Sequence, residues 1–198
     1  MNDDYPYDFR SPKDILRAAK QLVEAFKESL EQNRTAVWTE ANFLALNHAL
    51  PPQFDLCKYY RHRNGWKEPN ESNGTEFLWD YLASNDQNGI YLVAESERAT
   101  GKALREDRPF LNDFEKLLYV FSPLKMLICR ARDSEDVTRI TAKLSQYARG
   151  CTNHFQPGCI FILYCRVKSG DQWFYWQCEG NPHPRQKTKF CLADQGFA

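Results

Sequence analysis

The middle of the chain reads TEFLWDYLA (75–83), SNDQNG (84–89), IYLVAESE (90–97), RATGKALREDRP (98–109), FLNDFEKLLYVF (110–121) and SPLKMLICR (122–130). Two short apolar runs in this segment carry acids inside them. Because residues two apart in a strand share a face, Glu76 and Asp80 fall on one face of the first run, and Glu95 and Glu97 on one face of the second. Buried carboxylates are costly to keep charged unless they are paired, hydrogen-bonded or bound to metal. If the two strands are neighbours, the sequence therefore predicts a carboxylate cluster that holds either protons or a divalent cation.

The composition predicts one globular domain spanning residues 1–198. Aromatic residues at 14% and hydrophobic residues at 42% are typical of a folded core rather than of disorder. The balance of 26 basic and 26 acidic residues excludes a globally basic nucleic-acid binder but permits a local basic groove beside an acidic site. No apolar run approaches the roughly 18–20 residues of a membrane span, and the acidic, polar first ten residues differ from a secretory signal. We therefore expect a cytoplasmic protein without a membrane span.

Cysteine usage agrees with that expectation. The seven cysteines are odd in number and form no CxxC pair, which favours reduced core thiols over a disulfide framework. The nearest alternative is a zinc site at Cys151, His154 and Cys159, whose spacing matches metal motifs poorly.

Apolar periodicity, capping residues and turn dipeptides predict alternating helices and strands. In chain order the expected elements are a helix over 11–33, a helix over 39–50, strands over 54–63, 75–83 and 90–97, a helix over 111–121, a strand over 124–131, a helix over 134–150 capped by Ser134, and a hairpin over 159–168 and 172–178. The tail from Gly180 carries no expected element. This order predicts an α/β (α+β) protein in which helices flank a mixed central sheet.

Asp80 in one strand and Glu95 in the next resemble the metal-binding acids of the PD-(D/E)xK superfamily, the restriction-endonuclease-like nucleases. The shared core of that family runs αβββαβ, with an Asp on the second strand and an acid, any residue and a Lys on the third. Residues 11–131 can be read in that order with one helix inserted, and residues 132–198 then form a C-terminal helix and hairpin. AESE (94–97), DFEKLL (113–118) and PLKMLI (123–128) also look like a bacterial branch of the superfamily without an assigned activity.

Two positions depart from the family pattern. Trp79, not Pro, precedes Asp80, and Glu97 stands at the lysine position. Some family members carry the lysine on the following helix, and Lys116 is the candidate for that role here. From its helical position, Lys116 either reaches the sheet or faces water.

The resemblance implies a metal-dependent nuclease that cleaves phosphodiesters of nucleic acid. Asp80 and Glu95 would hold Mg²⁺ (or Mn²⁺), Lys116 would orient water or stabilise charge, and Glu97 would serve as a further ligand or base. The alternative is a nuclease-like module that no longer cuts and acts by binding nucleic acid or protein.

The loop that follows Glu97 supplies the candidate contacts to a nucleic-acid backbone. They are Arg98, Lys102, Arg105 and Arg108. A solvated basic loop explains the same four residues equally well. The sequence does not define an oligomeric state and is compatible with a homodimer.

Overall fold

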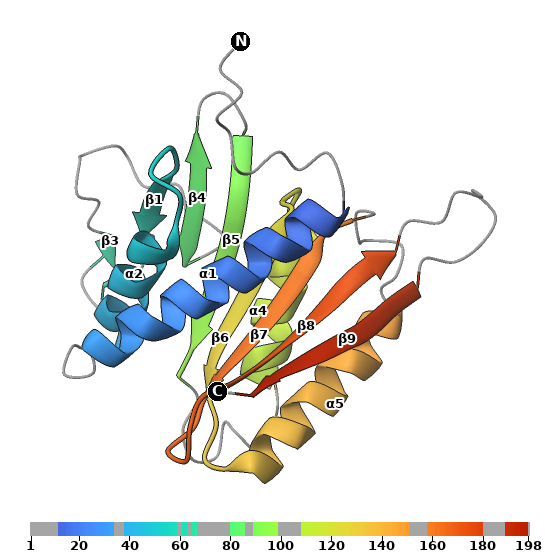
Figure 1. Cartoon of the computed structure of the whole chain (residues 1–198). Helices are drawn as coiled ribbons and strands as arrows, with labels where there is room; N and C mark the ends of the chain where they lie inside the picture. Colours follow the sequence, from blue (N-terminus) through green and yellow to red (C-terminus); the bar gives the residue numbers. More distant parts are fainter. Residues whose placement is uncertain are drawn as a thin grey trace.

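The computed structural model describes residues 12–33, 38–58, 61–62, 65–66, 80–85, 89–98, 108–150, 158–179 and 189–197. Its centre is a seven-stranded mixed sheet with the order β1-β4-β5-β6-β7-β8-β9 (Figure 1). The strands of this sheet are β1 (Asp55–Lys58), β4 (Tyr81–Asn85), β5 (Gly89–Glu97), β6 (Leu124–Arg130), β7 (Ile160–Arg166), β8 (Gln172–Glu179) and β9 (Lys189–Phe197). A separate two-stranded sheet pairs β2 (Arg61–His62) with β3 (Gly65–Trp66). The expected α/β class with a mixed sheet is confirmed.

The mode of strand pairing changes twice across the main sheet. β1, β4 and β5 are antiparallel, β5, β6 and β7 are parallel, and β7, β8 and β9 are again antiparallel. The two parallel connections contain helices α4 (Arg108–Leu118) and α5 (Ser134–Gly150). A parallel connection needs such a crossover, whereas the short links suit antiparallel neighbours.

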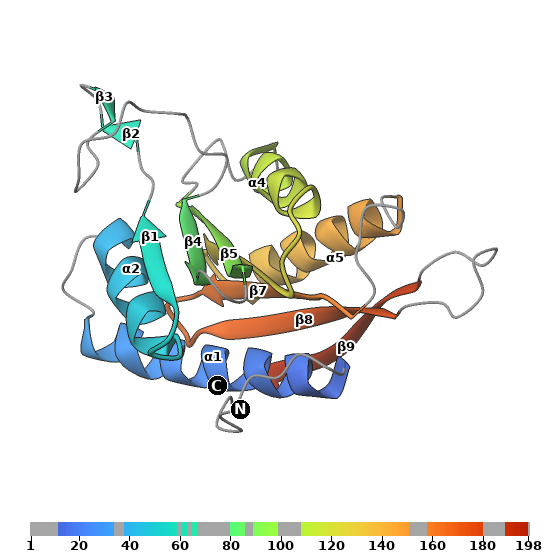
Figure 2. The same cartoon turned by 90° about the horizontal axis from the view of Figure 1, so that it is seen from above.

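Helices cover both faces of the sheet, as Figure 2 shows from above. Helices α1 (Pro12–Gln32) and α2 (Trp38–Ala49) pack on one face, and α4 and α5 pack on the other. Apolar residues of α1 recur at helical spacing and are buried: Ile15, Ala19, Leu22, Val23, Phe26 and Leu30. Two apolar clusters, one on each side of the sheet, therefore make the core.

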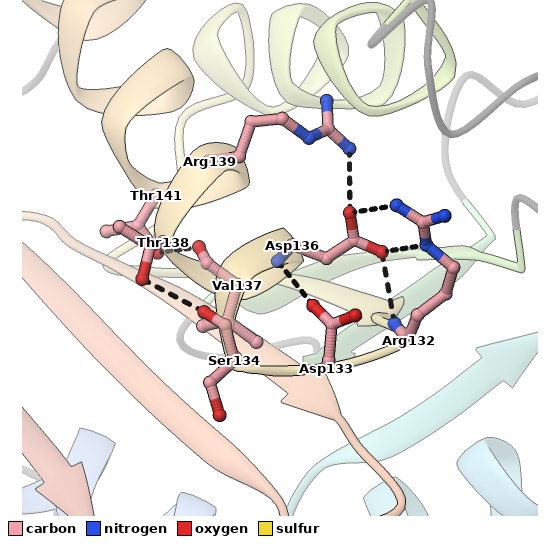
Figure 3. A network of polar contacts seen from close by, with 8 residues as sticks. All are labelled: Arg132, Asp133, Ser134, Asp136, Val137, Thr138, Arg139 and Thr141. Carbon is pink, nitrogen blue, oxygen red and sulfur yellow. Dashed lines mark hydrogen bonds and ion pairs between the residues drawn. The ribbon is translucent and has the colours of Figure 1, made fainter.

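Helix α5 starts with a dense polar network (Figure 3). Asp133 Oδ1 accepts a hydrogen bond from the backbone N–H of Asp136 at 2.9 Å, so Asp133, and not the expected Ser134, caps the helix. Arg132 donates from Nε and Nη2 to the Asp136 carboxylate at 2.5 and 2.8 Å. These hydrogen bonds lower the pKa of Asp136 against the effect of its burial.

Two expected strands have other bounds in the described residues than the sequence suggested. The strand expected over 54–63 ends at Lys58, and Arg61 and His62 belong to the small separate sheet. The strand expected over 75–83 has its described part in β4, which starts at Tyr81, so Asp80 immediately precedes the strand. Glu76 lies outside the described residues.

Helix α4 and the C-terminal strand also differ from expectation. The helix expected over 111–121 starts at Arg108 and ends at Leu118, which leaves Phe121 exposed rather than in the apolar stripe. The tail that carried no expected element contains β9, an edge strand paired with β8. Within the described ranges, no helix has the length and apolar character needed to cross a membrane.

Three cysteines of the described core, Cys129, Cys159 and Cys165, are thiols that form no disulfide. Cys129, Cys159 and Cys165 are buried, and the Sγ atoms of Cys129 and Cys165 lie 3.3 Å apart on neighbouring strands. Cys151 and His154, the partners of Cys159 in the alternative zinc site, lie outside the described residues.

Candidate functional site

The structure brings Asp80, Glu95, Glu97 and Lys116 together at the end of β5, on the face covered by α4. Val93, two residues before Glu95, packs in the apolar cluster of this face, and alternation along the strand places Glu95 and Glu97 on the same side. Lys116 comes from α4 and approaches Glu95 from above the sheet. We call Asp80, Glu95, Glu97, Asp113 and Lys116 the acidic cluster.

A β-bulge in the β4–β5 pair aligns the two key acids. Asn85 pairs with Gly89 and Ser84 with Ile90, but Ala83 pairs with Leu92, which leaves Tyr91 as the extra residue. Beyond the bulge Tyr81 pairs with Ala94, so the next position sets Asp80 opposite Glu95. Without the bulge Asp80 would face Ala94, whose side chain packs on the opposite side of the sheet.

Glu95 is the buried centre of the cluster, with only 1% of its surface exposed. Burial raises its pKa to about 9, and the negative charges of Asp80 and Asp113 act in the same direction. Near neutral pH, and without a cation, Glu95 therefore carries a proton. The protonated carboxyl group donates a hydrogen bond that lowers the pKa of Asp80.

Lys116 supplies the positive charge of the cluster. Its Nζ lies 2.9 Å from Asp113 Oδ1 and 3.3 Å from Glu95 Oε1. Burial lowers the pKa of Lys116, but the hydrogen bond to Asp113 and, once Glu95 has ionised at high pH, the charge of Glu95 outweigh burial and raise it. Lys116 thus remains an ammonium, and 35% of its side chain is still exposed, so the cluster is open to solvent on this side.

Asp80 is fixed by the backbone of β5. Its Oδ2 accepts a hydrogen bond from the Ser96 N–H at 2.8 Å. Burial raises the pKa of Asp80 to about 6 although this hydrogen bond opposes the shift. Asp80 is therefore mostly ionised near neutral pH.

The Ser96 side chain points to the other face and connects β5 to α2. Ser96 Oγ accepts hydrogen bonds from Trp38 Nε1 at 2.8 Å and from Asn42 Nδ2 at 2.7 Å. Asn42 itself is completely buried. Helix α2 therefore fixes the position of Ser96. This residue lies between Glu95 and Glu97 on β5, and its N–H donates the hydrogen bond to Asp80.

Glu97 ends β5 at the rim of the cluster. Burial raises its pKa to about 7, and both the charge of Asp113 and a hydrogen bond to that carboxylate add to the shift. A carboxyl group with this pKa exchanges its proton near neutral pH, as a general base must.

The candidate nucleic-acid contacts lie mostly outside the structure. Arg98 is exposed directly after β5. Lys102 and Arg105 are outside the described residues, and Arg108 is described only in its backbone as the first residue of α4.

The sequence interpretation missed three contributors to the site. Asp113 was missed because an acidic residue on a helix usually faces solvent. Its position three residues before Lys116 is nevertheless the spacing at which helical side chains pair. Trp38 and Asn42 are far from the site in sequence, and no local pattern links them to Ser96.

The donor set is small for a metal. No group of three or more His, Cys, Asp or Glu side chains arranged to hold a metal ion occurs in the described part of the chain. Mg²⁺, however, usually takes one or two carboxylates and completes its shell with water and phosphate oxygens. Asp80 and Glu95 fit that sparse kind of site, and the buried Glu95 Oε1 makes no hydrogen bond there beyond its 3.3 Å charge contact with Lys116 Nζ.

No family model, no curated protein and no solved structure matches the chain.

Proposed function

We propose that the protein is a metal-dependent phosphodiesterase of the PD-(D/E)xK type that cleaves nucleic acid. The observation that carries this proposal is the contact of Lys116 Nζ with Glu95 Oε1 at 3.3 Å, beside Asp80. Two acids and one lysine are the three groups that the family chemistry requires. They meet here although they come from three different elements.

The order of the elements supports the same assignment. Helix α1, strands β1, β4 and β5, helix α4 and strand β6 follow the αβββαβ order of the family, with α2 and the small β2–β3 sheet inserted. Asp80 then stands immediately before the second core strand and Glu95 on the third. Helix α5 and strands β7, β8 and β9 extend this core.

The lysine comes from α4 because the strand position is taken by Glu97. A lysine at position 97 would project beside Asp80 and Glu95 from the strand itself. Lys116 instead reaches Glu95 from the helix, and Asp113 fixes its direction one turn earlier. The departure from the family pattern is thus compensated by a residue twenty-one positions from Glu95 in sequence.

Asp80 and Glu95 would hold the metal, which when bound neutralises phosphate charge and lowers the pKa of a coordinated water. Metal binding requires Glu95 to lose the proton that it carries near neutral pH. Lys116 stabilises negative charge that develops on the phosphate, and Glu97 accepts a proton from the attacking water.

A cleavage assay tests the proposal. The protein is incubated with labelled single-stranded and duplex DNA and RNA, with Mg²⁺, Mn²⁺ or EDTA. We expect cleavage that needs the metal, that is lost in Asp80→Asn, and that falls by at least about 10²-fold in Lys116→Gln. Lys143→Gln, at an exposed position on α5, is the matched control and keeps full activity. The absence of metal-dependent cleavage, or equal cleavage by Asp80→Asn, excludes the nuclease.

A binding module without catalysis is the second candidate. Glu97 favours it, because four carboxyl groups around one lysine repel a phosphate more than the family pattern does. Such a module would bind its ligand equally well with EDTA, and Mg²⁺ would not raise its melting temperature.

A further inference from the structure

Two arginines stand side by side at the edge of the sheet where the parallel strands end. Arg130 is the last residue of β6, Arg166 is the last residue of β7, and the two are register partners. Neighbouring strands lie about 4.8 Å apart, so the two side chains start as direct neighbours. The sequence interpretation gave no role to either residue.

Both side chains project on the face covered by α1 and α2. Ile128 and Tyr164, two residues earlier on the same strands, pack in the apolar cluster of that face. The Arg166 guanidinium lies over the Trp38 ring, with Cζ 4.9 Å from the ring centroid. This contact orients the guanidinium without neutralising it.

Neither arginine forms an ion pair with any residue that the structure describes. Asp171, whose charge acts on Tyr164 as that of Arg166 does, accepts hydrogen bonds from Tyr164 Oη and the Val167 N–H. Like charges at register positions destabilise a sheet. A bound anion would remove that repulsion.

The position of the pair relates it to the acidic cluster. Glu97 ends β5 at the same edge of the sheet, which lies at the bottom of Figure 1, and the exposed Arg98 follows it. Ligands of α/β proteins commonly bind beyond the carboxyl ends of parallel strands. The acids occupy one face at this edge and the arginines the other, so a chain that crosses the edge contacts both.

We propose that Arg130 and Arg166 bind backbone phosphates of the nucleic-acid strand whose cleaved phosphodiester lies at Asp80 and Glu95. The proposal rests on the proposed function and assigns the phosphate contacts of that substrate. Guanidinium groups match phosphate oxygens bidentately, and they carry no base specificity in this role.

Salt-dependent binding tests the arginine pair separately from cleavage. The anisotropy of a fluorescein-labelled single-stranded oligonucleotide is measured in EDTA between 50 and 200 mM NaCl, for wild-type protein and for Arg130→Ser/Arg166→Ser. Each lost phosphate contact lowers the slope of log K against log salt by about 0.7. We expect the wild-type protein to lose about sevenfold more affinity than the variant over this range. Lys13→Ser/Lys143→Ser removes two exposed charges elsewhere and should keep the wild-type slope.

Arg130→Ser alone is the second variant, because Arg166 packs on Trp38 and its loss could disturb the fold. We expect Arg130→Ser to change the slope of log K against log salt by half as much as the double variant does. An unchanged slope in both variants, or an equal change in the lysine control, overturns the site. Displacement of the oligonucleotide by sodium phosphate at matched ionic strength also overturns it, in favour of a free-anion site. If the slope changes as expected but Mg²⁺ supports no cleavage, the phosphate site stands and the nuclease fails.

Discussion

Glu95 is the residue on which the site depends. The pattern of acids inside apolar runs was sufficient to identify Asp80, Glu95 and Glu97, because buried acids are rare and need partners. The reach of Lys116 could not be predicted, since a lysine at the edge of a helical stripe faces sheet or water depending on how the helix packs. The proton on Glu95 likewise depends on three-dimensional neighbours that the sequence does not place.

The stability of the metal-free protein should fall as the pH rises. The pKa of Glu95 is about 9 in the folded protein against 4.5 for an ordinary glutamate. The folded state thus keeps a proton that the unfolded state releases, and the stabilisation is complete below about pH 4.5 and lost as the pH rises through 9. One such proton changes the free energy of unfolding by about 1.4 kcal/mol per pH unit. Urea unfolding in EDTA between about pH 7.5 and 9 measures the slope, because Asp80 and Glu97, with pKa values of about 6 and about 7, are then mostly ionised in both states.

Glu95→Gln should flatten this pH dependence, because an amide holds no titrating proton. Glu135→Gln, at an exposed position on α5, should leave it as in the wild type. Equal slopes in Glu95→Gln and wild type would show that burial of Glu95 does not control its protonation.

Ser96 should matter more than its partial burial suggests. Ser96→Ala leaves two donors, Trp38 Nε1 and Asn42 Nδ2, without their acceptor, and each such loss costs about 1–3 kcal/mol. Ser145→Ala is a matched control that removes a single acceptor, that of Trp176 Nε1. Urea unfolding should give the larger destabilisation for Ser96→Ala. A larger destabilisation by Ser145→Ala would show that the hydrogen bonds from α2 to Ser96 do not stabilise the site.

At the scale of elements, the β4–β5 hairpin sets the geometry of the acids. The two acid-bearing strands, which the sequence interpretation treated as possible neighbours, are antiparallel neighbours in the sheet. The bulge at Tyr91 was not predictable, because a bulge interrupts the alternation on which strand reading depends. Likewise β9 was missed because its residues carry little apolar alternation and only pairing with β8 orders them.

Gly89 tests the hairpin directly. It has a φ of 68°, and among the described residues other than its chain neighbours no atom would lie within 4 Å of an added Cβ, so the cost of a substitution is conformational. Gly89→Ala should lower the free energy of unfolding by about 1–2 kcal/mol, whereas Gly89→Asn should cost less because Asn tolerates this backbone region. Urea unfolding midpoints measure the stabilities of the three proteins. Equal stability of Gly89→Ala and wild type would contradict a left-handed backbone conformation at Gly89.

At the scale of the molecule, the order of the helices and of the main-sheet strands up to β8 could be predicted, but the sheet itself could be predicted only as a mixed one. Short links favoured antiparallel pairs and helical crossovers favoured parallel ones. Long-range strand pairing extends the sheet to seven strands. It also aligns the ends of the parallel strands β6 and β7, where Arg130 lies beside Arg166. The polar ends of three separate strands meet there, which no single segment specifies.

Metal binding by the acidic cluster tests the central claim most directly. The melting temperature is measured at pH 8 with EDTA and with increasing Mn²⁺, in wild type, Asp80→Asn, Glu95→Gln and the control Glu135→Gln. Mn²⁺ at 100 times its dissociation constant should stabilise wild type and control by about 2.7 kcal/mol, and neither cluster variant. An unchanged melting temperature in wild type, or an equal rise in Asp80→Asn and Glu95→Gln, would contradict a divalent-metal site at these two acids.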